Sequence, residues 1–116
     1  MSTLIARRSE PHPPGTPPLS AEVVERLLAE VPGWKVEESR LSKTYSFKNF
    51  HETMAFVNAL AWVAHQEDHH PDLEVSYNRC RVVYWTHTVG GLSLNDFICA
   101  AKVEALFFPP GPSSQQ

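Results

Sequence analysis

The chain has 116 residues, of which 42% are hydrophobic and 20% charged, and its formal net charge is −3 at pH 7. This composition is ordinary for a globular protein and excludes both a disordered chain and a disulfide scaffold. The basic residues are scattered, so we expect no direct binding of nucleic acid or of an anionic membrane surface. No segment approaches the roughly 20 apolar residues that a membrane span needs.

The ten prolines divide the chain unevenly, because five cluster near its beginning and three near its end. We therefore predict a flexible Pro-rich N-terminal tail at residues 1–18, one domain at residues 19–108 and a Pro/Ser/Gln tail at residues 109–116. A domain of about 90 residues buries only about two-thirds of its unfolded surface, so contacts with further copies of the chain are expected.

The chain has two cysteines, Cys80 and Cys99, and each lies in an apolar segment. This placement favours buried free thiols in a reducing compartment over a disulfide. We therefore predict a cytoplasmic location.

The first half of the domain has the pattern of a helix followed by two strands. Apolar residues recur at three- and four-residue spacing after Ser20, which predicts an amphipathic helix that Pro32-Gly33 ends. Apolar and polar residues then alternate in runs that start at Trp34 and Leu41. We predict a hairpin with its turn near residues 38–40.

The second half repeats this plan. Asn49, with Glu52 three residues later, predicts the start of a helix that ends near Asp68. Residues 73–77 and 80–87 then alternate as two further strands. On the second of these strands, alternation places the side chain at position 87 on the same face as those at positions 83 and 85.

A last helix follows the glycine pair Gly90-Gly91, with Ser93 and Asp96 in its first turn and a buried stripe that extends to Phe108. The order is therefore α-β-β-α-β-β-α. Hairpins bring antiparallel pairing, so the predicted fold class is α+β, a two-layer structure with a four-stranded antiparallel sheet and helices on one face.

Four of the six histidines lie within 23 positions: His65, His69, His70 and His87. Imidazole both gives and takes protons near neutrality, so several histidines in one pocket indicate general acid–base chemistry. One alternative is a set of helix-end residues, where a cationic imidazole stabilises the negative end of the helix. Another is a zinc or iron site, but Pro71 disturbs the ligand geometry, and we predict no metal.

The histidines belong to a longer pattern. A charged residue, a His-His-Pro triplet, a tyrosine, a histidine and an aspartate follow at fixed intervals; here they are His65, His69-His70-Pro71, Tyr77, His87 and Asp96. This pattern resembles the signature of the pterin-4a-carbinolamine dehydratases. The resemblance covers nearly all of residues 19–106, including Gly33-Trp34. One departure is His65, where the family often has glutamate.

The resemblance implies a reaction and its residues. Members of the family dehydrate 4a-hydroxytetrahydrobiopterin to quinonoid dihydropterin in tetrahydropterin recycling, and the step needs an acid and a base but no cofactor. By analogy the catalytic residues are His69 and His87, as the acid–base pair, and His70, which positions the pterin. The substrate-binding residues are Trp34, His65 and Asp96.

Two of these assignments have structural alternatives. Trp34 also fits a core position at the start of a strand, and Asp96 also fits a helix cap. Tyr77 is expected to pack in the core. The family further implies a homodimer or homotetramer.

A second hypothesis is that the chain is an inactive dehydratase-like binding module with a protein partner. The family includes a coactivator of a homeodomain transcription factor and RuBisCO assembly factors linked to carboxysomes. His65 and the tails motivate this alternative.

Overall fold

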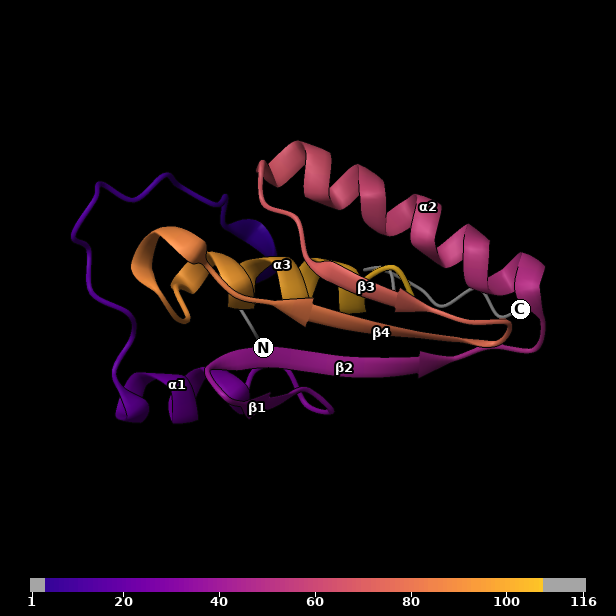
Figure 1. The fold of residues 1–116 in the computed structure, drawn as a ribbon, viewed down its shortest axis with the longest axis horizontal. Helices are drawn as coiled ribbons and strands as arrows, with labels where there is room; N and C mark the ends of the chain where they lie inside the picture. Colours follow the sequence, from indigo (N-terminus) through magenta and orange to yellow (C-terminus); the bar gives the residue numbers. More distant parts are fainter. Residues whose placement is uncertain (1–3, 108–116) are drawn as a thin grey trace.

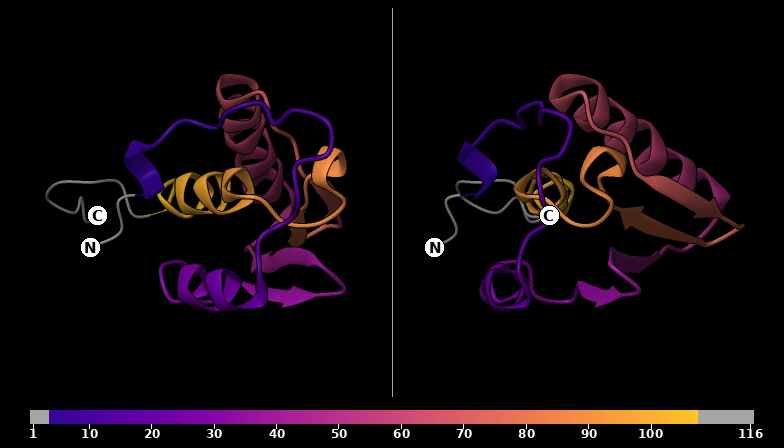
Figure 2. Two further views of the ribbon diagram at one scale, coloured as in Figure 1. Left: turned by 90° about the vertical axis from the view of Figure 1, so that its left-hand side faces the viewer. Right: turned by 60° about the vertical axis from the view of Figure 1, so that its left-hand side comes forward.

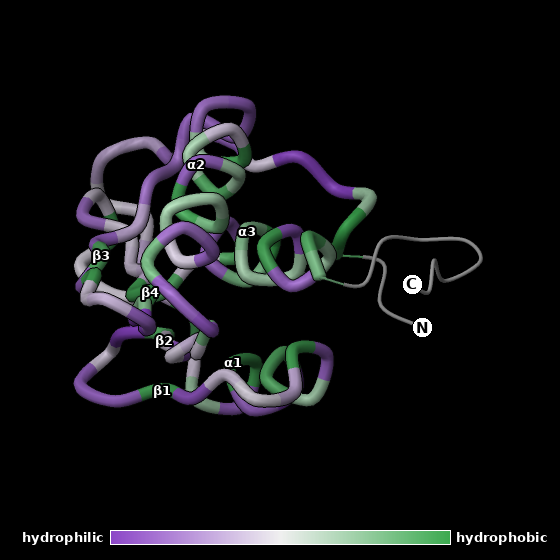
Figure 3. Tube along the Cα trace, turned by 90° about the vertical axis from the view of Figure 1, so that its right-hand side faces the viewer, coloured by the Kyte–Doolittle hydropathy of each residue, from purple (hydrophilic) through white to green (hydrophobic). Residues whose placement is uncertain are grey.

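A four-stranded antiparallel sheet forms one layer of the protein, and its α-helices form the other (Figures 1 and 3). The computed structural model describes residues 4–107. The elements in chain order are η1 (Leu4–Ala6), α1 (Ala21–Leu28), β1 (Lys35–Glu37), β2 (Arg40–Ser46), α2 (Phe50–Glu67), β3 (Asp72–Val75), β4 (Arg79–Tyr84), η2 (His87–Val89) and α3 (Leu94–Glu104). The α+β class and the α-β-β-α-β-β-α plan are confirmed, with η1 and η2 as additional short turns.

The strand order is β1-β2-β4-β3, so the two hairpins meet along β2 and β4 at the centre of the sheet. Leu41 pairs with Tyr84, and Tyr45 pairs with Cys80. All four of these residues are buried beneath the helices. The period-2 alternation of each strand thus places its apolar side chains on the face that the helices cover.

Local sequence signals account for most element ends. Glu38 and Ser39 take left-handed backbone angles, with φ of 51° and 60°, in the two-residue turn of the first hairpin. The Asn49 side chain accepts a hydrogen bond of 2.9 Å from the Glu52 N–H and begins α2. The helix ends at Glu67, and the next residue, Asp68, is also left-handed with φ of 51°. The predicted hairpin turn and both ends of this helix are confirmed.

The core lies between the sheet and helices α2 and α3. Its fully buried side chains include Leu41, Leu60, Tyr84 and Phe97. Nearly every residue of α3 from Asn95 to Val103 is buried, because this helix lies between the sheet and the N-terminal segment. A helix buried on most sides is a rigid support for any residue in its first turn.

The strand that was predicted to extend to residue 87 is shorter. β4 ends at Tyr84, the Thr86 N–H donates to the Gly91 carbonyl oxygen at 2.8 Å, and His87 begins η2. The prediction that His87 shares a strand face with Trp85 is therefore wrong. The left-handed Gly90, with φ of 69°, allows the chain to fold back on itself here.

The placement of Tyr77 also differs from the expectation. Its side chain is 63% exposed and lies in the turn after β3, so packing in the core is wrong for this residue. Its backbone does contact the helix layer, because its carbonyl oxygen accepts from the Thr53 hydroxyl at 2.9 Å.

The N-terminal segment lies against the domain in its first part. Leu4 is 2% exposed and belongs to the core cluster. The Ser9 N–H donates to Glu67 Oε1 at 2.8 Å, and the Glu10 N–H donates to Asn95 Oδ1 at 2.9 Å. The proline pattern predicts a flexible tail here, whereas Leu4 is buried in the core and hydrogen bonds to α2 and α3 hold Ser9 and Glu10. The domain division at residue 18 stays a prediction, and residues 109–116 lie outside the described part.

Glu67 gives the fold a pH dependence. Burial raises the pKa of its carboxyl, but the Ser9 N–H, Lys102 and Arg8 lower it more, so the net pKa is below the usual 4.5. A depressed pKa stabilises the folded state above 4.5, and this stabilisation is lost as the pH falls through the folded-state pKa. We expect the urea unfolding free energy to fall below about pH 4.5, and to fall less steeply in Glu67→Gln.

Glu37→Gln is the matched control, because Glu37 is exposed and pairs only with exposed Lys35 among the described residues. This variant should keep the wild-type pH profile. A Glu67→Gln profile parallel to that of the wild type would contradict the assignment.

Candidate active site

His69 and Asp96 form a close pair at the centre of the candidate site. His69 Nε2 lies 2.6 Å from Asp96 Oδ1, and the aspartate is fully buried. The other carboxylate oxygen accepts hydrogen bonds from the Thr86 hydroxyl at 2.8 Å and from the Ser93 N–H at 2.9 Å. Asp96 therefore has two roles, since it caps α3 and also holds the histidine.

The His69 ring has a fixed orientation. It lies nearly parallel to the Tyr84 ring, with 5.6 Å between centroids and 14° between planes, and its side chain is 13% exposed. An ionised Asp96 requires the proton to be on Nε2, which leaves the lone pair of Nδ1 as a proton acceptor. A histidine oriented by a buried carboxylate in this way is suited to act as a general base.

A cavity of about 210 Å³ adjoins His69. The end of α2 contributes Asp68 and His69 to its lining, and the loop after β4 contributes Thr86 and Thr88. The N-terminal segment closes another side through residues 9–12. The cavity is smaller than the roughly 300–1,000 Å³ of most ligand sites.

The other three histidines of the pattern lie outside the cavity lining. His70 is exposed, and its Nδ1 has only a long 3.5 Å contact with the Pro71 carbonyl oxygen. His87 is exposed beside Trp85, with 3.7 Å between ring centroids. His65 is exposed near Trp62, with 5.6 Å between the ring centroids. The structure thus brings His69 and Asp96 together but, within the residues it describes, shows no side-chain contact of the other three histidines with this pair, and the roles predicted for these histidines remain predictions.

His65 and His69 do not share a helical face. The helix α2 ends at Glu67, and left-handed Asp68 turns the chain before His69. Within residues 4–107 no group of three or more His, Cys, Asp or Glu side chains is arranged to hold a metal ion. The described part of the chain therefore offers no ligand set for the metal alternative.

Trp34 lies in the core, where its side chain is 6% exposed. Its Nε1–H donates to Glu104 Oε1 at 3.2 Å, and the same oxygen accepts from the Tyr45 hydroxyl at 2.6 Å and from Lys43 Nζ at 2.9 Å. Burial raises the pKa of Glu104, but the Tyr45 and Lys43 contacts outweigh it and lower the pKa overall. This cluster was not predicted, because its members are up to 70 residues apart. The role of Trp34 as a wall for the pterin stays a prediction.

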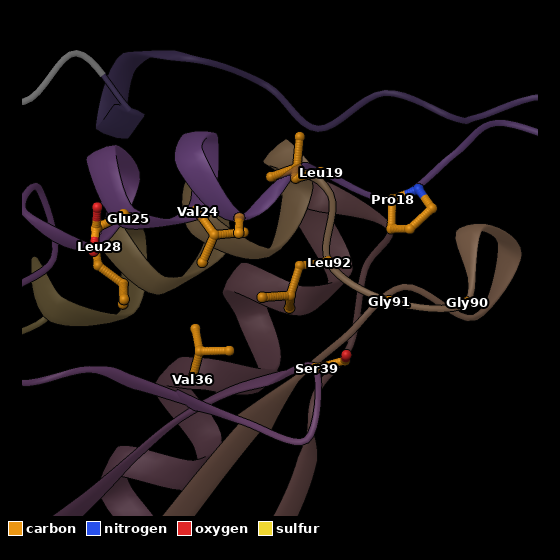
Figure 4. Close-up of a pocket in the computed structure, with 11 residues that line it drawn as sticks. Pro18, Leu19, Val24, Glu25, Leu28, Val36, Ser39, Gly90, Gly91 and Leu92 are labelled. Atoms are coloured by element: carbon orange, nitrogen blue, oxygen red, sulfur yellow. The ribbon is translucent and has the colours of Figure 1, made fainter.

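A larger cavity of about 420 Å³ lies between α1, the first hairpin and the loop at Gly90-Gly91 (Figure 4). Leu19, Val24 and Leu92 are among its lining residues, and Glu25 is the one ionisable side chain there in the described part of the chain. It lacks an acid–base pair, so it is not the candidate active site.

The cysteines are confirmed as free and buried. Burial raises the pKa of both thiols, to about 12 for Cys99, so both stay protonated near neutrality and are poor nucleophiles. None of the helices in the described residues has the length and apolar character needed to cross a membrane.

A family model named "Pterin 4 alpha carbinolamine dehydratase" matches residues 17–106. The chain therefore belongs to the pterin-4-alpha-carbinolamine dehydratase family. The match contains His69, Asp96 and every other residue of the signature.

Bacterial relatives support the family. A protein of Nitrosomonas eutropha is 59% identical over 104 residues, which cover 89% of this chain and 92% of the relative. One of Chromobacterium violaceum is 60% identical over 96 residues, or 83% of this chain and 89% of the relative. Both are described, provisionally, as pterin-4-alpha-carbinolamine dehydratases.

Solved structures support the fold. A transcriptional coactivator/pterin dehydratase from Brucella melitensis has a TM-score of 0.74 and 27% identity, covering 77% of this chain and 97% of its own. A pterin dehydratase-like protein identified as a RuBisCO assembly factor in the alpha-carboxysome has a TM-score of 0.52 and 24% identity. The match covers 63% of this chain and 84% of that protein. At that identity the second likeness concerns the fold alone.

The dual role of Asp96 can be tested by substitution. Asp96→Ala removes the acceptor of Thr86, Ser93 and His69 at once, and we expect a loss of about 3 kcal/mol in unfolding free energy by urea denaturation. Asp72→Ala, at an exposed aspartate, is the control and should unfold like the wild type. An Asp96→Ala protein as stable as the wild type would show that the hydrogen bonds of Asp96 contribute nothing to the unfolding free energy.

Proposed function

We propose that the protein dehydrates 4a-hydroxytetrahydropterins in tetrahydropterin recycling. The observation that carries this proposal is the histidine base held by a buried aspartate beside a small cavity, in a chain of the dehydratase family. The reaction removes the hydroxyl group from C4a and the proton from N5, and a C4a=N5 double bond forms. The products are water and quinonoid dihydropterin.

His69 is the proposed base. Its Nε2 donates to Asp96, so Nδ1 takes the N5 proton and the nearby carboxylate stabilises the imidazolium that results. The partly buried ring strengthens this charge interaction relative to water. No electron or group is transferred, so the step is complete without a cofactor.

His87 is the proposed acid, which gives a proton to the departing hydroxyl group, and His70 positions the pterin. Their places in the chain support these roles, because His70 follows the cavity-lining His69 and His87 lies between two other lining residues, Thr86 and Thr88. Trp34 and His65 stay proposed substrate contacts by analogy with the family.

The dehydratase assay tests the proposal directly. Carbinolamine generated by an aromatic amino acid hydroxylase should lose water faster with the purified protein and without added metal. His69→Ala and His87→Ala should each lower kcat about a hundredfold or more, since general acid–base groups contribute about 10²–10⁴. His51→Ala, at an exposed histidine of α2, is the matched control. If the wild-type protein shows no activity in this assay, the proposed dehydratase function is refuted.

A binding module is the second candidate. Two large apolar side chains on α2 are exposed, Trp62 at 61% and Phe50 at 48%, and in this candidate they would serve as contacts to the partner. The coactivator and RuBisCO assembly roles named for the two structural neighbours belong here. A protein that binds no pterin, yet co-purifies with one partner that Trp62→Ala releases, would favour this candidate.

We also propose a homodimer or homotetramer. β3 is an edge strand with Val75 exposed at 42%, and an unpaired edge is suited to pairing with a second copy. The cytoplasmic location stays a prediction, supported by the two free thiols.

A further inference from the structure

We infer that the N-terminal segment is part of the active site and that His12 binds the substrate. This inference rests on the proposed dehydratase function. His12 lies outside residues 17–106, which the family model matches, and outside the histidine pattern of the sequence. In Figure 2 the segment, drawn in indigo, passes the end of α2 and the loop after β4 on its way to α1.

Two sets of contacts fix the segment just before His12. Ser9 is bound to Glu67 through its N–H, at 2.8 Å, and through its hydroxyl group, which donates to the Glu67 carbonyl oxygen. Glu10 and Asn95 exchange two hydrogen bonds, of 2.9 Å from the Glu10 N–H and of 2.7 Å to its carbonyl oxygen. The anchors belong to the last turn of α2 and the first turn of α3, the two elements that also position His69 and Asp96.

The anchoring carboxylate is already satisfied. Glu67 is 3% exposed in its side chain and pairs with Lys102 at 3.2 Å and with Arg8 at 3.4 Å. It thus holds the segment in place and is not free to bind a ligand. Residues 9–12 are held as one wall of the 210 Å³ cavity, with His69 in the same lining.

The His12 ring lines the cavity and has one unsatisfied nitrogen, which is the evidence for a ligand. Its Nε2 atom is buried and has no hydrogen-bond partner in the part of the chain that the structure describes. A buried ring nitrogen without a partner is unfavourable, and a ligand that pairs with it removes that penalty. Imidazole can donate to a carbonyl oxygen or accept from a ring N–H, and a pterin has both groups along one edge.

The same geometry has an opposite interpretation, in which the segment blocks the pocket and must leave before a substrate enters. The two interpretations predict opposite changes in substrate affinity. If His12 binds the substrate, its removal weakens binding; if the segment blocks the site, removing His12 or its anchor strengthens binding.

The test uses the full chain and steady-state kinetics with carbinolamine. His12→Ala should raise KM about tenfold, which corresponds to one lost ligand hydrogen bond of about 1.4 kcal/mol, and should change kcat less than about twofold. His12→Gln keeps a polar group near the Nε2 position and should restore part of the affinity. His51→Ala should match the wild type. Asn95→Ala, which frees Glu10, should raise KM as His12→Ala does.

A binding readout separates this inference from the proposed function. In protein with ¹⁵N-labelled histidine, added biopterin should shift the ring signals of His69 and His12 and leave those of His51 unchanged. A shift at His69 alone, with unchanged KM in His12→Ala, overturns the inference and keeps the dehydratase. A lower KM in His12→Ala also overturns it and supports the blocking segment. If no histidine signal moves and no turnover occurs, the proposed function fails as well.

Discussion

The buried carboxylate of Asp96 is the constraint on which the candidate active site depends. A fully buried charge is tolerated only where hydrogen bonds replace water, and here three donors do so, from the loop after β4, the start of α3 and the histidine after α2. Three segments distant in sequence are thereby tied to one group. The position of His69 is consequently tied to the core beneath it, and in the proposed reaction a base fixed in this way reduces the reorganisation that a proton transfer requires.

Features of the fold that depend on neighbouring residues could be predicted from the sequence. The hairpin turn at Glu38-Ser39, the start of α2 at Asn49 and its end at Asp68 follow from short-range capping and turn signals. The sheet follows from alternation. The family signature also proposes His69 and Asp96 as site residues, a prediction that stays open, and the geometry shows that they contact each other and that the aspartate both caps α3 and orients the histidine.

Features that depend on long-range contacts could not be predicted in this way. Alternation continues past Tyr84, so pattern alone extends β4 to His87, while the bridge between Thr86 and Gly91 ends it. Likewise, a proline-rich composition predicts a tail, but it carries no information about Glu67 or Asn95, which hold residues 9 and 10. Glu104 and its three donors are a similar case, because a mid-sequence tryptophan gives no sign of which helix it will reach.

The central pairing of β2 with β4 also bears on how the protein folds. Each hairpin forms from neighbouring residues, but Leu41 must find Tyr84 across the whole of α2 before the sheet is continuous. Such non-local pairing slows folding relative to a helical bundle of the same size, since chain entropy is lost before the contacts form. During synthesis the first hairpin emerges long before its partner strand, with the apolar residues of β2 uncovered. An interval in which β2 is synthesised but still unpaired with β4 is therefore built into the chain order.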